Sequence, residues 1–163
     1  MNVRLVILGS GEPRYEQQLT AFAQRYPERL GIRFAFDEPL SHQIQAGCDC
    51  FLMPSRYEPC GLTQLYSLRY GTIPIVRATG GLRDTVQSFD PATGEGTGFV
   101  FMEPSADALI EAVRAAVEAF TDKQRWRQLQ RKAMEQDFSW ERSARRYVEL
   151  YQRAMAGQFG AAS

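Results

Sequence analysis

The chain has 163 residues, of which 44% are hydrophobic and 23% are charged, and its 19 Lys and Arg side chains balance its 19 Asp and Glu side chains. A chain of this length buries roughly 70% of its unfolded surface, so it can form a core without metal or disulfide cross-links. This composition excludes the collagen-like, disordered and disulfide-rich classes. Because positive charge is not concentrated anywhere, we expect neither nucleic acid nor an anionic membrane as a partner.

Two further global features concern location and redox state. The apolar runs are too short to span a bilayer, and the N-terminal MNVRLVILGSG is typical of a strand rather than a signal peptide. A cytoplasmic location is therefore expected. The three cysteines match neither a disulfide framework nor a CxxC pair, so they are expected to be free thiols.

Short apolar runs alternate with amphipathic segments over the first two thirds of the chain. Apolar runs that end at glycine or proline predict strands buried on both faces, and apolar residues at helical spacing predict helices. In chain order we expect a strand at 3–8, a helix at 13–26, a strand at 32–36, a helix at 40–46, a strand at 50–53, a helix at 59–70, a strand at 73–76, a short helix through 82–86, a loop at 88–98 and a strand at 99–101.

The remainder of the chain is predicted to be helical. Ser105 is expected to cap one helix, a Thr121-x-x-Gln124 capping box to open a second, and Ser139 to cap the last. Residues 157–163 are small and are expected to form a disordered tail.

The alternation implies right-handed βαβ units, so the predicted fold class is α/β with a parallel sheet covered by helices on both faces. Residues 1–156 are expected to form a single domain. Ligands of such sheets bind at the carboxyl ends of the strands. The turns after the first, third and fourth expected strands are therefore candidate sites.

The turn after the third expected strand is the main candidate. Four backbone N–H groups at the predicted helix start lack helical partners, and the helix dipole adds positive potential, so they suit a phosphate. These amides belong to Cys60, Gly61, Leu62 and Thr63. Glu58, just before them, would accept hydrogen bonds from sugar hydroxyls or oppose positive charge developing on a sugar. The alternative interpretation is that Glu58 caps the helix and Cys60 is a small buried side chain.

Two glycine-containing turns are weaker candidates. Thr79, Gly80 and Gly81 follow the fourth expected strand, where glycine would allow a ligand to approach the main chain, but a plain turn explains them equally well. Gly9 and Gly11 follow the first strand without the third glycine of a dinucleotide fingerprint. We therefore expect no nicotinamide cofactor.

The remaining polar candidates favour structural roles. His42 is the only histidine, and it is expected to donate or accept a structural hydrogen bond rather than to act as a base. No set of metal-ligating residues surrounds it in the sequence, so neither a metal nor another cofactor is expected. Cys60 at a helix start could be reactive, yet no partner for a nucleophilic role is evident.

One long motif carries a family resemblance. Residues 54–86, PSRYEPCGLTQLYSLRYGTIPIVRATGGLRDTV, resemble the donor-binding region of bacterial glycogen synthases and plant starch synthases, which are retaining glucosyltransferases of the GT-B fold. Supporting matches are LGSGEP at 8–13, LSHQIQAGCD at 40–49, TGFVF at 97–101 and DFSWERSARRYVELY at 137–151.

The resemblance implies a Rossmann-like, three-layer αβα nucleotide-sugar-binding domain that binds ADP-glucose, in an enzyme that extends α-1,4-glucan. Glu58 would contact the glucosyl unit and support its oxocarbenium-like transition state. The amides of residues 60–62, with Thr63, would hold the diphosphate. Phe36 would pack on the adenine, and Gly9 and Gly11 would line the same cleft.

The resemblance also implies missing parts. The family's N-terminal domain, with its Lys-x-Gly-Gly-Leu loop and acceptor-side residues, has no counterpart in the sequence. Neither have the first strand and helix of its C-terminal domain, which carry an Arg and a Lys that neutralise the donor phosphates. We expect the isolated chain to be inactive, and the glucan acceptor to bind only together with a complementary N-terminal domain.

Deleting that strand from the order 3-2-1-4-5-6 leaves the flavodoxin-like order 2-1-3-4-5. We therefore expect strands 3–8 and 50–53 to pair, giving one five-stranded parallel sheet. The last helix, which packs on the N-terminal domain in GT-B enzymes, would expose its apolar face or bind a partner, including a second copy of the chain. Two alternative functions stay open: a non-catalytic fragment or subunit, and a GT-B transferase that uses UDP- or GDP-sugars.

Overall fold

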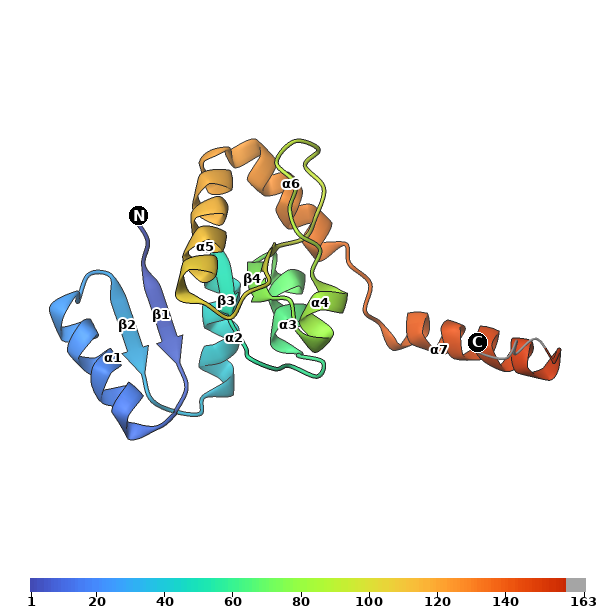
Figure 1. Ribbon diagram of the computed structural model, residues 1–163, viewed down its shortest axis with the longest axis horizontal. Helices are drawn as coiled ribbons and strands as arrows, with labels where there is room; N and C mark the ends of the chain where they lie inside the picture. Colours follow the sequence, from blue (N-terminus) through green and yellow to red (C-terminus); the bar gives the residue numbers. More distant parts are fainter. Residues whose placement is uncertain (158–163) are drawn as a thin grey trace.

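The computed structural model describes residues 1–157, in which five short strands alternate with helices (Figure 1). The strands are β1 (Leu5–Leu8), β2 (Leu30–Arg33), β3 (Cys50–Met53), β4 (Ile73–Arg77) and β5 (Phe99–Phe101). The helices are α1 (Pro13–Arg25), α2 (Glu38–Gly47), α3 (Thr63–Tyr70), α4 (Gly80–Thr85), α5 (Ala106–Thr121), α6 (Lys123–Met134) and α7 (Trp140–Met155). The predicted α/β class is confirmed. The expected tail falls mostly on residues 158–163, outside the described part of the chain.

Several predicted boundaries are confirmed because local chemistry sets them. β3 and β5 cover the expected residues. Ser105 caps α5 by accepting a hydrogen bond from the Ala108 N–H, and Ser139 caps α7 by accepting one from the Arg142 N–H.

Other boundaries were predicted wrongly. α3 begins at Thr63 rather than at residue 59, because Gly61 has a φ of 73°, which no right-handed helix accommodates. β2 ends at Arg33, which leaves Phe36 outside the strand. α6 is capped by Asp122, which accepts hydrogen bonds from two N–H groups of the first turn, whereas Thr121 is the last residue of α5.

The expected single five-stranded sheet is also wrong. The parallel strands form two sheets, β1–β2 and β3–β4–β5, and β1 does not pair with β3. In Figure 1, β1 lies between β2 and β3. Paired strands lie about 4.8 Å apart. The connection between the two sheets runs through α2, which packs on α3. The expected pairing of β1 with β3 is therefore absent.

The hydrophobic core surrounds the middle strand of the larger sheet. Ile73 and Ile75 of β4 pack with Leu68 of α3 and with buried side chains of β5, α5 and α6. Val76 points to the other face, where Leu82 and neighbouring side chains of and after α4 form a second cluster. This sheet is thus covered by helices on both faces, as expected of a parallel sheet.

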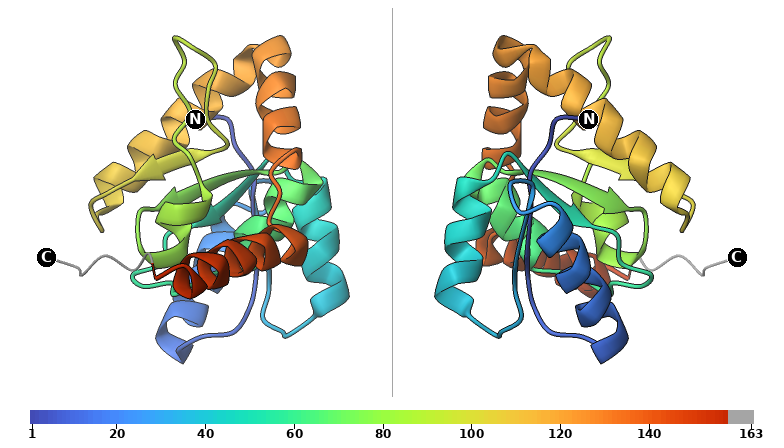
Figure 2. Two further views of the ribbon diagram at one scale, coloured as in Figure 1. Left: turned by 90° about the vertical axis from the view of Figure 1, so that its right-hand side faces the viewer. Right: turned by 90° about the vertical axis from the view of Figure 1, so that its left-hand side faces the viewer.

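Two regions lie outside this core. Among residues 1–49 the only buried side chain is Gln45, and β1 exposes apolar side chains. α7 extends away from the rest of the molecule in Figure 1 and has no buried residue. In the left view of Figure 2, which looks along that direction, α7 lies in front of the other elements. Within residues 1–157, no helix combines the length and the apolar character needed to cross a membrane.

Candidate functional site

The loop of residues 54–62, between β3 and α3, carries the main candidate residues and is held from β4. The guanidinium of Arg77, at the end of β4, donates from Nε to the Ser55 carbonyl at 2.9 Å and from Nη2 to the Arg56 carbonyl. Thr63, the first residue of α3, donates its hydroxyl hydrogen to the Met53 sulfur at 3.5 Å. Both ends of the 54–62 loop are therefore fixed to the larger sheet.

The glycine pair after β4 presses against the same loop. The Gly81 N–H donates to the Glu58 carbonyl at 3.0 Å. A Cβ atom at Gly80 would overlap the Glu58 carbonyl oxygen, and one at Gly81 would overlap the backbone of Cys60. Gly80 and Gly81 are thus required where two backbone segments meet. Thr79, the third member of this turn, is the N-terminal residue before α4, and its side chain makes no capping bond.

Beneath the loop lies the fully buried side chain of Gln64, from the first turn of α3. Its Nε2 lies 2.9 Å from the Cys60 carbonyl oxygen, 2.8 Å from that of Gly61 and 3.2 Å from Thr85 Oγ1 of α4. The Thr85 hydroxyl in turn donates to the Gly81 carbonyl at 2.6 Å. The 54–62 loop, α3 and α4 are thereby joined through one polar network.

The surface of the loop offers a carboxylate and free amides. Within residues 1–157, the backbone N–H groups at the loop end donate to no other group. They belong to Cys60, Gly61, Leu62 and Thr63. The carboxylate of Glu58 is on a half-buried residue and forms neither an ion pair nor a hydrogen bond with any described residue. Four donors and one unpaired carboxylate at a single turn suit a ligand that combines an anion with hydroxyl groups.

The capping alternative for Glu58 is wrong in this structure. α3 begins five residues after it, and the N-terminal residue before the helix is Leu62, which makes no side-chain capping bond. The alternative of Cys60 as a buried side chain is also wrong, because Cys60 is exposed. Of the two alternatives that the sequence left open for Glu58 and Cys60, the ligand-binding one therefore remains.

The three less central candidates lie after the strands of the smaller sheet. Gly9 and Gly11 follow β1, and Phe36 follows β2 and is 96% exposed. The connections after β1, β2 and β3 lie on the same lower side of Figure 1. The Gly11 N–H already donates to the Glu16 carboxylate at 2.9 Å. The structure thus brings together Glu58, residues 60–63 and residues 79–81, and it shows no contact of Gly9, Gly11 or Phe36 with them.

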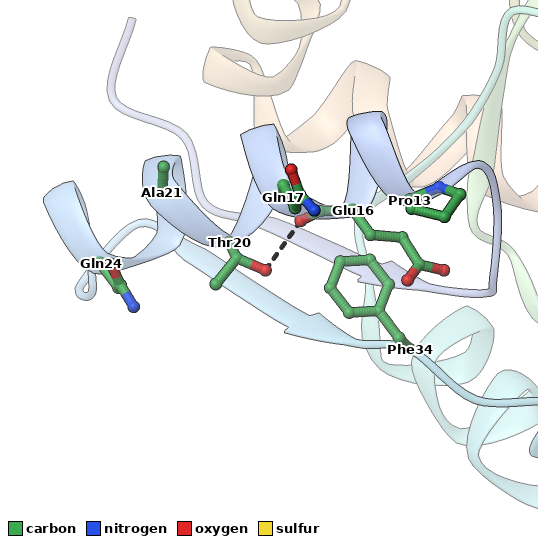
Figure 3. Close-up of a pocket in the computed structure, with 7 residues that line it drawn as sticks. All are labelled: Pro13, Glu16, Gln17, Thr20, Ala21, Gln24 and Phe34. Carbon is green, nitrogen blue, oxygen red and sulfur yellow. Dashed lines mark hydrogen bonds between the residues drawn. The ribbon is translucent and has the colours of Figure 1, made fainter.

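Neither of two cavities coincides with the 54–62 loop. A groove of about 380 Å³ runs along one face of α1 beside Phe34 (Figure 3). A second cavity of about 350 Å³ lies between α5 and the segment before β5, with Phe89 and Phe99 in its wall. No predicted site residue lines either of these two cavities.

The other titratable candidates have structural surroundings. His42 Nδ1 lies 3.2 Å from the Tyr70 hydroxyl, which agrees with the structural hydrogen bond expected for it. All three cysteines are free. Burial in β3 raises the pKa of Cys50 to about 12, with a smaller contribution from the charge of Asp49. Residues 1–157 contain no cluster of His, Cys, Asp and Glu that could hold a metal ion.

Sequence analysis missed Arg77, Gln64 and Thr85, which hold the loop rather than line it. Arg77 had a detectable signal, because a charged residue directly ends a buried strand. Gln64 had a weaker one: a polar residue lies between the apolar positions of an expected helix. Thr85 had none, since its contact spans 21 residues of sequence.

Comparison with known proteins gives consistent matches. Residues 1–133 match the family described as "Glycosyl transferases group 1". A glycogen synthase of Koribacter versatilis (strain Ellin345) is 54% identical over 149 residues, which is 91% of this chain and 31% of that protein. A glycogen synthase of Bacillus cereus (strain Q1) is 53% identical over 154 residues, or 94% of this chain and 32% of that protein. The chain spans about a third of the length of these relatives.

Solved structures agree in fold. The catalytic domain of starch synthase IV from Arabidopsis thaliana, bound to ADP and acarbose, superposes with a TM-score of 0.79 at 38% identity, covering 94% of this chain and 32% of that one. A sucrose-phosphate synthase from Thermosynechococcus elongatus superposes with a TM-score of 0.64 at 24% identity, with 94% and 39% covered, and shows the fold alone.

Proposed function

Because the chain belongs to the group 1 family of glycosyl transferases, and is similar to glycogen and starch synthases, we propose that it is the donor-binding part of a glucosyltransferase that extends α-1,4-glucan. Its donor in this proposal is ADP-glucose. The observation that carries the proposal is the 54–62 loop, with unpaired amides beside an unpaired carboxylate. The starch synthase that it resembles was solved with ADP and acarbose bound.

The chemistry follows from charge. The amides of residues 60–62, with Thr63, would hold the diphosphate, because backbone donors fixed in place bind an anion without reorganising. Glu58 would lie beside the glucosyl unit and stabilise the positive charge of its oxocarbenium-like transition state. Gly9, Gly11 and Phe36 are proposed to border the same cleft at the sugar-nucleotide's other end, with Phe36 against the adenine.

The chain alone is proposed to be inactive in glucan extension. Positioning two reactants against each other supplies much of the rate of a transfer reaction. Within residues 1–157 this proposal assigns the 54–62 loop to the sugar nucleotide and assigns no residue to the glucan acceptor. A complementary N-terminal domain is proposed to bind the glucan acceptor and restore activity. A cytoplasmic location stays a prediction.

Calorimetric titration of the chain with ADP and with ADP-glucose tests this proposal. We expect saturable binding of both. Glu58→Gln should retain ADP affinity and weaken ADP-glucose binding, because only the sugar meets residue 58. Gly61→Val should abolish both, since valine is strained at a φ of 73° and its Cβ would overlap Gln64. Absence of binding by the folded wild-type chain would contradict the proposal.

A second candidate function is association with a partner, as a non-catalytic subunit. The observation that favours it is α7, where Trp140, Tyr147 and Tyr151 are each more than half exposed on one helix. Exposed apolar surface of this kind commonly marks an interface. Sedimentation velocity over a hundredfold range of concentration should show a dimer if α7 joins two copies. A monomer throughout that range, with ADP bound, would favour the donor-binding role alone.

A further inference from the structure

The buried amide of Gln64 fixes how two peptide groups of the 54–62 loop are turned. Its Nε2 is within hydrogen-bond distance of the carbonyl oxygens of Cys60 and Gly61, at 2.9 and 2.8 Å. All described peptide bonds are trans, and in a trans peptide the C=O and the following N–H point in opposite directions. Holding the two carbonyls toward Gln64 therefore turns the N–H groups of Gly61 and Leu62 away from it.

The choice of glutamine at this position follows from the same geometry. A primary amide supplies two N–H donors without a charge, whereas a glutamate would present only acceptors to the two carbonyls. An apolar side chain would leave both carbonyls without that donor. The amide also reaches Thr85 Oγ1 at 3.2 Å, and Thr85 donates onward to the Gly81 carbonyl. Gln64 thus links the loop to the segment that begins α4.

The oxygen of the same amide has no partner in the described part of the chain. Oε1 of Gln64 is fully buried and has no hydrogen-bond partner among residues 1–157. A buried acceptor without a partner destabilises the fold, and removing the amide would in addition leave the Cys60 and Gly61 carbonyls without its N–H donors. The unpartnered oxygen lies so close to Gly61 that a Cβ added there would overlap it.

We propose that Gln64 is a positioning residue for the diphosphate, which turns the Gly61 and Leu62 amides outward and ties them to α4 through Thr85. This inference rests on the proposed function, because it concerns the same turn. In this proposal the Gln64 side chain does not contact the bound sugar nucleotide. Its effect passes through the two peptide groups whose carbonyls it holds.

The test compares two buried glutamines. Gln64→Met removes the donors and keeps the length of the side chain. Gln45→Met is the matched control, because Gln45 is 2% exposed and also has an unpartnered Oε1, but it lies on α2 and donates to Ser41. Binding of ADP and of inorganic pyrophosphate is measured by calorimetry, with circular dichroism to verify folding. We expect Gln64→Met to lose about tenfold in affinity for both ligands, equivalent to one hydrogen-bonded contact, and Gln45→Met to keep wild-type affinity.

The outcomes separate the two proposals. Wild-type affinity in folded Gln64→Met would overturn the positioning role and leave the proposed function standing. No binding of either ligand by the wild-type chain would overturn both. If Gln64→Met does not fold, amide NMR of the wild-type chain decides: pyrophosphate should shift the Gly61 and Leu62 signals, and unchanged signals at saturating ligand would overturn the inference.

Discussion

The β3–β4–β5 sheet and the β1–β2 sheet each contain a largely apolar strand, β4 and β1, yet only the first sheet lies in a core. Every residue from Ile73 to Val76 of β4 is buried, whereas the LVIL strand β1 exposes Leu5 and Val6 by 43% and 49%. The difference comes from neighbours. β4 has a strand on each side and helices on both faces, while β1 has β2 on one side and nothing paired on the other. Whether an apolar strand is buried therefore depends on the elements that surround it as well as on its own sequence.

The largest contrast is expected between two tryptophans. Trp126 of α6 is 3% exposed and stacks on Phe99, and Trp140 of α7 is 86% exposed. Trp126→Ala should lower the free energy of unfolding by about 3–5 kcal/mol, and Trp140→Ala by less than about 0.5 kcal/mol. Urea unfolding followed by circular dichroism measures both. A large loss from Trp140→Ala would mean that α7 is packed in solution.

A leucine pair applies the same comparison to the two sheets. Leu129→Ala, at a 1% exposed position under the larger sheet, should cost about 2–5 kcal/mol. Leu5→Ala in β1 should cost less than about 1 kcal/mol, since much of that side chain is already in contact with water. Unfolding is measured at two protein concentrations. Equal losses at the higher concentration alone would show that association covers β1.

A third expected effect is a pH dependence of stability that arises from Cys50 in β3. The pKa of Cys50 is raised from 9.0 to about 12 by burial, so the folded state favours the neutral thiol. This stabilisation is fully present below pH 9 and is lost as pH rises toward 12, because the unfolded chain ionises first. The stability difference between wild type and Cys50→Ala should therefore shrink over that range. A difference independent of pH would contradict the burial of Cys50.

Sequence analysis predicted the parts of the fold that local chemistry determines. The apolar run at Cys50–Met53 and the caps at Ser105 and Ser139 depend on a few adjacent residues, and they are confirmed. The start of α3 was wrong because Pro59 suits a first helical turn, while Gly61 two residues later adopts a positive φ that ends any such helix. The division into two sheets was missed because the pairing of β1 with β3 is a long-range contact that no run of adjacent residues determines.

The candidate site divides in the same way. Glu58 and the amides after it are adjacent in sequence, so a single motif predicts them together. Arg77, Gln64 and Thr85 act across turns of the chain, and their roles depend on distances that only the folded structure supplies. For the glycine pair, sequence analysis left open both the approach of a ligand and a plain turn, and the folded chain places the backbone of Glu58 and Cys60 against Gly80 and Gly81.

That backbone contact determines the shortest segment that could carry this site into another protein. A loop whose carbonyl meets the Gly81 N–H, and whose shape leaves no space for a side chain at residues 80 and 81, cannot be transplanted by its own sequence. Grafting it into another scaffold would have to carry the whole span from β3 to the end of α4. For protein engineering, residues 50–85, from β3 to the end of α4, would thus be transferred as one piece.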